Sequence, residues 1–188
     1  MSDAPIVDQA DFRRVLTERL DLRAVTLDDL DALYRINADP AVWRHQPEGR
    51  HATPATTREW IERAVARWEG EGLSYWTARL RGDDEVIGIG GVQLIASRGN
   101  WNLYYRLAHA HWGCGYATEL SVAAIAAGNR HSPDVPVVAW AHAHNAGSRA
   151  VAVRAGLIDH GLLLDPFHRR QAYRFADREL PDVDPWAG

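Results

Sequence analysis

The segment WGCGYAT, residues 112–118, places two glycines directly before a predicted helix. Gly113 and Gly115 allow a tight turn in which successive backbone N–H groups point outward. These N–H groups and the positive end of the helix dipole together form an anion site, for which a pyrophosphate is the natural occupant. A short Gly-x-Gly also occurs in ordinary turns between a strand and a helix, so the segment alone leaves both interpretations open.

The sequence on both sides of this turn predicts an α+β fold. Its sheet is mixed and mainly antiparallel, with about six to seven strands flanked by about four helices. The predicted strands are 20–24, 73–80, 86–95, 101–107, 137–144, 157–164 and 171–176. The predicted helices are 27–37, 56–69, one from the glycine turn to Gly128-Asn129, and one from Asn145 to about Ala155.

Composition narrows the function classes. The chain has 188 residues, which fits one domain over 1–188 with residues 1–12 as a polar, flexible leader. A net charge of −4 provides no basic surface for nucleic acid. No stretch reaches the ~20 apolar residues of a membrane span, and the N-terminus lacks the apolar run of a signal peptide. The lone cysteine, Cys114, can form no internal disulfide, so we expect a cytoplasmic protein with no membrane partner.

Two other phosphate-binding folds fit the sequence less well. A Rossmann fingerprint would place glycine where Thr118 stands, and an acidic residue where the next predicted strand ends in His144-Asn145. A Walker loop requires a lysine, and all 21 basic residues of this chain are arginine. The second glycine cluster, Gly88-Ile89-Gly90-Gly91, lies within a predicted strand and indicates a bulge or a close neighbour.

A second segment, NAGSRAVAVRAGL at 145–157, begins with an asparagine suited to cap a helix. It stands with TERLDLRAVTLDDLDAL at 17–33, EVIGIGGVQLI at 85–95 and HWGCGYATEL at 111–120, segments that are spread over nearly the whole chain. In order and spacing, these segments resemble the GNAT superfamily of N-acetyltransferases. The branch that they resemble most is that of the RimJ/RimL-like ribosomal-protein N-terminal acetyltransferases.

The resemblance implies the GNAT fold and acetyl-CoA as the donor. The strand that ends near Leu107 would splay from its neighbour at a bulge and pair with the pantetheine arm. Asn145 would contact that arm, and Ser148 would lie near the thioester sulfur. The backbone amides that would bind the pyrophosphate belong to Trp112, Gly113, Cys114, Gly115, Tyr116, Ala117 and Thr118.

The glycine turn departs from the family pattern at two positions. Ala110 replaces a common Gln or Arg, and Cys114 replaces a common basic residue between the glycines. Because the anion site uses backbone amides, it can survive the loss of these side chains. Compensating charge could come from His111, Arg149 or Arg154, each of which is also an ordinary surface residue type.

Direct attack of an amine on the thioester requires a base for the ammonium and an acid for the departing thiolate. Ser148 is the candidate acid, with Tyr173 as another. Relatives often carry Glu where Asn102 stands, and Asn cannot accept a proton at neutral pH. His142 and His144 are substitutes for the base, because strand alternation puts both on one face, although both could equally be packed histidines.

Aromatic residues predict the acceptor side, because aromatic rings can enclose an ammonium. We expect Trp43, Tyr34 and Tyr105 to contact the acceptor, which is a protein N-terminal α-amine or a small-molecule amine. The asparagine at position 102 favours an alternative, a non-catalytic acyl-CoA-binding protein. The resemblance also allows a homodimer. No acidic or cysteine cluster accompanies the pairs His109-x-His111 and His142-x-His144, so we expect no metal.

Overall fold

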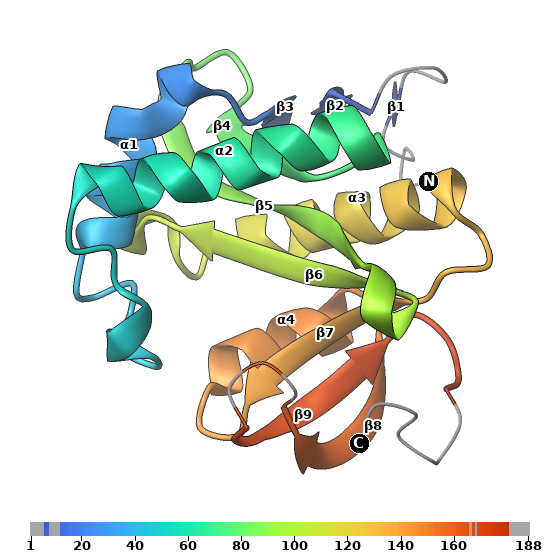
Figure 1. Ribbon diagram of the computed structural model, residues 1–188. Coiled ribbons are helices and arrows are strands. Elements are labelled where there is room, and N and C mark those ends of the chain that lie inside the picture. Colours follow the sequence, from blue (N-terminus) through green and yellow to red (C-terminus); the bar gives the residue numbers. More distant parts are fainter. Residues whose placement is uncertain (1–5, 8–11, 166, 168, 181–188) are drawn as a thin grey trace.

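The computed structural model describes residues 6–7, 12–165, 167 and 169–180. Within them, nine strands form one sheet in the order β1-β2-β3-β4-β5-β6-β7-β9-β8 (Figure 1). All neighbouring strands are antiparallel except β6 and β7, which are parallel. The strands are β1 Ile6–Val7, β2 Arg14–Leu16, β3 Leu20–Ala24, β4 Tyr75–Leu80, β5 Val86–Ile95, β6 Asn100–Leu107, β7 Val137–His142, β8 Ile158–Leu164 and β9 Gln171–Ala176.

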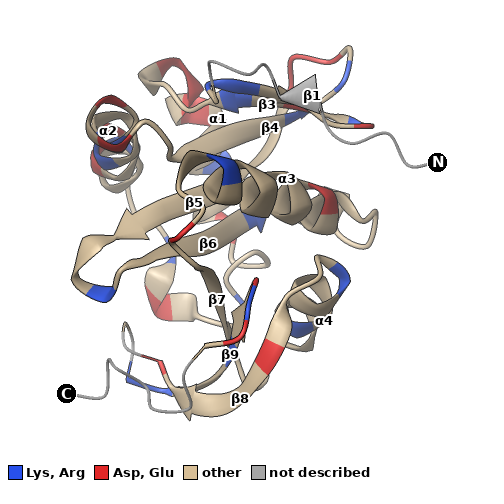
Figure 2. Cartoon of the chain, turned by 90° about the vertical axis from the view of Figure 1, so that its right-hand side faces the viewer, with Lys and Arg blue, Asp and Glu red and all other residues tan. Residues whose placement is uncertain are grey.

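Four α-helices flank this sheet in the described part of the chain. They are α1 Leu30–Ala38, α2 Pro54–Glu71, α3 Tyr116–His131 and α4 Ala146–Arg154. Figure 2 shows α2 on one side of β5 and β6 and α3 on the other, which gives the sheet two covered faces. Large apolar side chains fill these layers, and the indoles of Trp76 and Trp101 are almost fully buried. None of the described helices has the length and hydrophobicity that a bilayer crossing requires.

The sheet has more strands than the predicted six to seven because β1 and β2 extend its edge. β2 is only three residues long, too short for an alternation signal, yet Val15 is fully buried and pairs with Leu22 of β3. The predicted leader 1–12 was therefore wrong at Ile6–Val7, which pairs with β2. Residues 1–5 and 8–11 of that leader lie outside the described part of the chain.

Two predicted element ends shift for identifiable reasons. Helix α3 does not stop at Gly128, because this glycine packs closely on its neighbours instead of ending the helix. A Cβ on Gly128 would lie 3.0 Å from Val137 and 3.5 Å from Trp101. Strand β7 ends at His142 and not at His144, because the Asn145 N–H donates to the His142 carbonyl at 2.8 Å and turns the chain.

The glycines of β5 confirm the close-neighbour interpretation. A Cβ on Gly90 would lie 2.8 Å from the carbonyl oxygen of Tyr104 on β6 and 2.7 Å from Leu120 on α3. Gly91 has φ +146°, and a Cβ there would lie 2.7 Å from the Ser74 carbonyl oxygen. These glycines therefore let β5 lie close to a neighbouring backbone on each side.

The sheet splays between β6 and β7, as predicted. Only Trp101 with Val137 and Asn102 with Val138 form pairs, although both strands continue beyond that point. The register of β5 against β6 is continuous from Gly88↔Leu107 to Ile95↔Asn100. The divergence therefore begins where the β6–β7 pairing stops, and the expected bulge in β6 is absent from that ladder.

An ion pair holds the start of α3 against the β2–β3 turn. The Arg19 guanidinium lies 2.7 Å from the Glu119 carboxylate, and Thr17 also donates to this carboxylate. A second guanidinium nitrogen of Arg19 donates to the Cys114 carbonyl at 2.9 Å. Burial alone would raise the pKa of Glu119, but the hydrogen bonds from Thr17 and Arg19 outweigh it and hold this pKa below its ordinary value.

We expect Gly90→Ala to destabilise the fold, because its Cβ would meet a backbone carbonyl that cannot move aside. Overpacking of this kind costs about 1–3 kcal/mol in the free energy of unfolding. The matched control is Gly70→Ala in α2, where a Cβ would meet nothing within 4 Å. Alanine should stabilise that helix by about 0.5–1 kcal/mol. Urea unfolding of both variants tests this, and equal shifts would contradict it.

We expect Glu119→Gln to lower the free energy of unfolding at pH 7 by about 1 kcal/mol, because Arg19 is half-exposed and solvent screens the pair. The folded-state pKa of Glu119 is depressed, so its contribution is complete above the ordinary value of 4.5 and disappears as the pH falls through the folded-state pKa. The free energy of unfolding of Glu119→Gln, measured from denaturation curves between pH 7 and pH 3, should therefore converge with that of the wild type as the pH falls. Glu69→Gln, which disrupts an exposed pair with Arg13, is the control and should change little.

Candidate functional site

Two adjoining cavities occupy the region where β6 and β7 diverge. The larger cavity, about 620 Å³, follows the end of β6, the glycine turn and α4. The smaller cavity, about 170 Å³, lies between β6, β7 and the loop at His45 and Gln46. Because six residues line both, the two cavities meet. The shared residues are His45, Tyr105, Arg106, Asn145, Ser148 and Val151.

The glycine turn contributes every one of its residues 112–118 to the larger cavity, together with Leu107 at the end of β6. Gly113 and Gly115 have φ +77° and +84°, which only glycine adopts readily. Gly115 is the N-cap of α3 and offers no side chain to the first N–H groups. Those amides therefore depend on water or a ligand in the larger cavity, which is the geometry of an anion site.

The side chains around the turn are arranged to keep it in place. The indole N–H of Trp112 donates to the Leu107 carbonyl at 2.9 Å, which ties the turn to β6. Among the three candidates for compensating charge, His111 and Arg154 line the larger cavity. Arg149 does not line it and lies instead over the Tyr173 ring, at 4.8 Å.

The start of α4 brings Asn145 and Ser148 to the junction of the two cavities. The Asn145 side-chain oxygen accepts from the Ser148 N–H at 3.1 Å, so it caps the helix and fixes Ser148. The Tyr105 hydroxyl donates to the Ser148 hydroxyl at 3.2 Å. Burial raises the pKa of Tyr105, so its hydroxyl keeps its proton at neutral pH.

The two candidate histidines have different surroundings. His142 is 8% exposed and lines the smaller cavity, with its Nε2 atom 3.6 Å from an Asp165 carboxylate oxygen. His144 is exposed on the turn after β7 and lines neither cavity; its Nε2 donates to the His45 carbonyl at 2.9 Å. The two rings lie 5.7 Å apart. Position 102 also faces this region, because Asn102 lines the smaller cavity.

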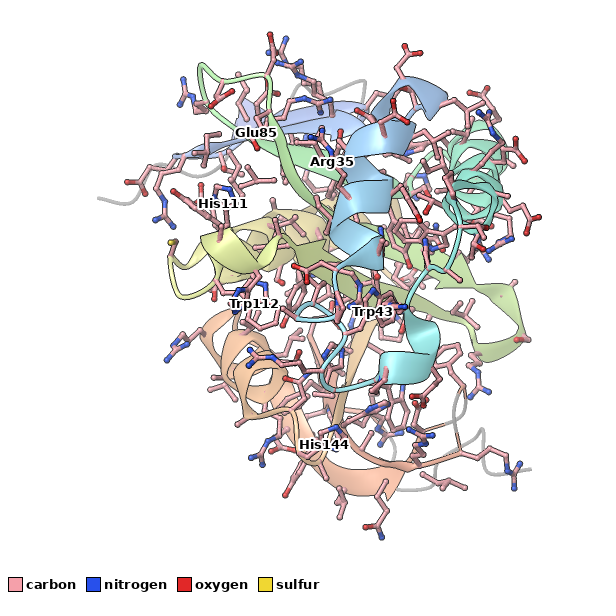
Figure 3. The ribbon with its side chains drawn as sticks, turned by 90° about the vertical axis from the view of Figure 1, so that its left-hand side faces the viewer. Arg35, Trp43, Glu85, His111, Trp112 and His144 are labelled. Carbon is pink, nitrogen blue, oxygen red and sulfur yellow. The ribbon has the colours of Figure 1, made fainter. Side chains whose placement is uncertain are left out.

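Of the three aromatic residues expected at the acceptor, Tyr105 alone lines the cavities. Trp43 is buried inside the molecule, and its indole N–H donates to the Asn37 carbonyl at 2.7 Å (Figure 3). The Tyr34 hydroxyl donates to the Ala52 carbonyl at 3.4 Å. Tyr173, the second candidate acid, also lies outside both cavities. Among the described residues, no group of three or more His, Cys, Asp or Glu residues could hold a metal ion.

Sequence reasoning missed several polar residues of the smaller cavity, among them His45, Arg106 and Asp165. Burial and then the positive charge of Arg106 lower the pKa of His45 to about 4, so this imidazole is neutral at pH 7. Asp165 is 1% exposed and sits in the loop between β8 and β9. Of these residues, only Arg106 had a signal in the sequence, because it is a charged residue within a predicted strand.

Comparisons with known proteins agree with this architecture. The uncharacterised N-acetyltransferase p20 of Bacillus licheniformis is 31% identical over 105 residues, covering 55% of this chain and 58% of that relative, which is less than two thirds of its length. The protein YkkB of Bacillus subtilis is 27% identical over 147 residues, covering 77% of this chain and 84% of that relative.

Solved structures share the fold. An acetyltransferase from Agrobacterium tumefaciens is 25% identical, with a TM-score of 0.72, covering 88% of this chain and 94% of its own. The ribosomal-protein acetyltransferase RimL, solved in complex with coenzyme A, is 18% identical, with a TM-score of 0.73. The match covers 89% of this chain and 97% of the RimL chain. The model of the GNAT acetyltransferase domain matches residues 19–158. The chain therefore belongs to the GNAT acetyltransferase family.

Proposed function

We propose that this protein transfers the acetyl group of acetyl-CoA to a primary amine by direct attack within a ternary complex. The observation that carries the proposal is the meeting of the two cavities at Tyr105 and Ser148. A donor in the larger cavity and an acceptor in the smaller one would bring their reacting atoms together there. Family membership and the coenzyme A complex of RimL support the choice of donor.

The larger cavity has the chemistry that coenzyme A requires. The uncapped amides at the start of α3 suit its pyrophosphate. Beyond Asn102, the edge of β6 that faces β7 is unpaired, so its backbone groups can bind the amides of the pantetheine arm as far as Leu107. Asn145 and Ser148 would then flank the thioester end.

The departing thiolate needs a proton, and two hydroxyls can supply it in sequence. In the proposed step, Ser148 donates its proton to the sulfur as the carbon–sulfur bond breaks. Tyr105, which already donates to Ser148, restores that proton, and the second proton that the attacking nitrogen releases returns Tyr105 to its neutral form through solvent in the cavity. Burial keeps the Tyr105 hydroxyl protonated, as a donor must be.

His142 is the better of the two candidate bases. It lines the smaller cavity, and the neighbouring Asp165 carboxylate would stabilise the imidazolium formed when His142 accepts the proton of the ammonium. His144 is exposed and hydrogen-bonded to the His45 carbonyl. With Asn102 unable to act as a base, the opposite proposal is a non-catalytic acyl-CoA-binding protein, which would bind acetyl-CoA without releasing thiol.

The acceptor is a protein N-terminal α-amine or a small-molecule amine. The family likeness to ribosomal-protein acetyltransferases favours the former, since RimL is named for an α-N-protein activity. That structural neighbour shares only 18% identity, so it guides the choice of substrates for testing and not the assignment.

We expect acetyl-CoA to raise the thermal unfolding temperature and a panel of amines and N-terminal peptides to release thiol. Ser148→Ala should lower kcat about 100-fold while leaving the acetyl-CoA shift in place, because it removes a proton donor and spares the amide site. Tyr105→Phe should lower kcat less than Ser148→Ala. Unchanged turnover of Ser148→Ala would contradict the proton-donor role, and thiol release by no amine would favour the non-catalytic alternative.

We expect His142→Gln to lower kcat about 100-fold, because it removes the proposed base. The matched control is His144→Gln, a histidine 5.7 Å away that lines neither cavity, whose kcat should stay within a few-fold of the wild type. A pH–rate profile of the wild type and His142→Gln provides the measurement. If both variants lose activity equally, or neither does, His142 is not the base.

A further inference from the structure

Arg106 is a buried cation at the junction of the two cavities. Arg106 is only 7% exposed, and its guanidinium carbon lies 3.3 Å from the centroid of the Trp43 ring. The Nε atom donates to the Tyr104 hydroxyl at 2.7 Å, and Nη1 donates to the Val42 carbonyl at 3.1 Å. These contacts fix the plane of the guanidinium without neutralising its charge.

The charge of Arg106 has no counter-ion in the described part of the chain. No carboxylate there lies within 4.0 Å of its guanidinium nitrogens, although buried charges are usually paired. Of its five N–H donors, those on Nη2 have no partner among the described residues. The nearby His45 has a pKa of about 4, lowered by burial and by Arg106, and so adds no charge at pH 7.

Arg106 lines both cavities, so its unbalanced charge borders the smaller, acceptor cavity as well as the larger one. Tyr105 and Arg106 are consecutive on β6, so their side chains leave opposite faces of the sheet. Tyr105 reaches Ser148 on α4, whereas Arg106 lies against Val42 and Trp43 in the loop after α1. Both line the smaller cavity, because it opens where the sheet is split.

The smaller cavity therefore carries opposite charges on separate elements. Arg106 on β6 contributes the positive one, and Asp165 beside His142 contributes the negative one. An acceptor amine is a cation until it is deprotonated, so it suits the Asp165 and His142 end. A planar guanidinium with spare donors suits a carboxylate, which it can bind through two parallel hydrogen bonds.

We propose that the acceptor of this enzyme carries a carboxylate close to its amine and that Arg106 binds this carboxylate. The inference rests on the proposed acetyl transfer and names its substrate class. The carboxylate can come from two sources: the α-carboxylate of a free amino acid, or the acidic side chain of the first residue of a peptide.

The first experiment compares carboxylate acceptors with their carboxamide isosteres in the thiol-release assay. One arm pairs amino acids with amino acid amides, and the other pairs Asp-initiated with Asn-initiated peptides. We expect the carboxylate member to have a kcat/KM at least about tenfold higher in one arm, which corresponds to ~1.4 kcal/mol. The arm with the preference identifies the source of the carboxylate.

The second experiment replaces the cation. Arg106→Gln should lower the ratio of kcat/KM for the carboxylate acceptor to kcat/KM for its carboxamide partner about tenfold or more, whatever its effect on both reactions together. Arg106→Lys should recover part of the preference, since it restores charge without the planar fork. Arg44→Gln, an exposed arginine whose guanidinium lies 5.5 Å from the Trp112 ring, is the control for a general change in charge and should keep the preference.

A binding measurement keeps the proposal testable without turnover. N-acetylated amino acids and N-acetylated Asp-initiated peptides have no free amine, so we expect one of them to stabilise the wild type thermally more than its carboxamide counterpart does. Arg106→Gln should abolish that difference; if this variant does not fold, the isostere comparison on the wild type decides alone.

The experiments distinguish a failure of the proposed carboxylate site from a failure of the proposed acetyl transfer. Equal kcat/KM values and equal stabilisation for carboxylates and carboxamides in both arms would overturn the role of Arg106 and keep acetyl transfer. No stabilisation by acetyl-CoA and no thiol release from any acceptor would overturn acetyl transfer itself.

Discussion

The short parallel contact between β6 and β7 is the constraint on which the site depends. Two residue pairs join the strands, at Trp101–Val137 and Asn102–Val138, before they diverge. Packing around this contact is tight, since Gly128 of α3 gives Trp101 and Val137 room to approach. Past it, each strand has an edge without a strand partner, and backbone groups in such a place need another hydrogen-bond partner. The sheet thereby acquires an opening at its centre that a ligand with amide groups can fill.

Much of the fold follows from local patterns in the sequence. The 10-residue strand β5 begins and ends where the turn before it and its apolar run predict, and Asn145 caps α4 as its side chain and position indicate. Backbone conformation at Gly113 and Gly115 could also be anticipated, because the demand for positive φ selects glycine. These features depend on neighbours within one turn or one strand, and sequence alone contains that information.

The features that sequence reasoning missed depend on contacts between distant residues. Arg19 and Glu119 lie 100 positions apart and meet only because β3 and α3 pack together. Trp43 was expected to face the acceptor, yet it supports Arg106 from beneath, which no periodicity could reveal. The same holds for His144, whose partner is a main-chain carbonyl 99 positions away. The identity of a side chain predicts which interactions it can form, whereas the fold decides which partner it contacts.

The hydrogen bond between His144 and the His45 carbonyl connects two walls of the site that are far apart in the sequence. The bond joins the loop that follows α1 to the turn that leads into α4, and each segment lines a different part of the split sheet. His45 borders both cavities, so the loop that this bond restrains forms part of the wall of each. The turn at the other end of the bond carries Asn145, which caps α4 and holds Ser148 in place. One side-chain hydrogen bond thus connects the loop that borders both cavities with the helix start that carries Ser148, so the two walls of the split sheet form one hydrogen-bonded frame.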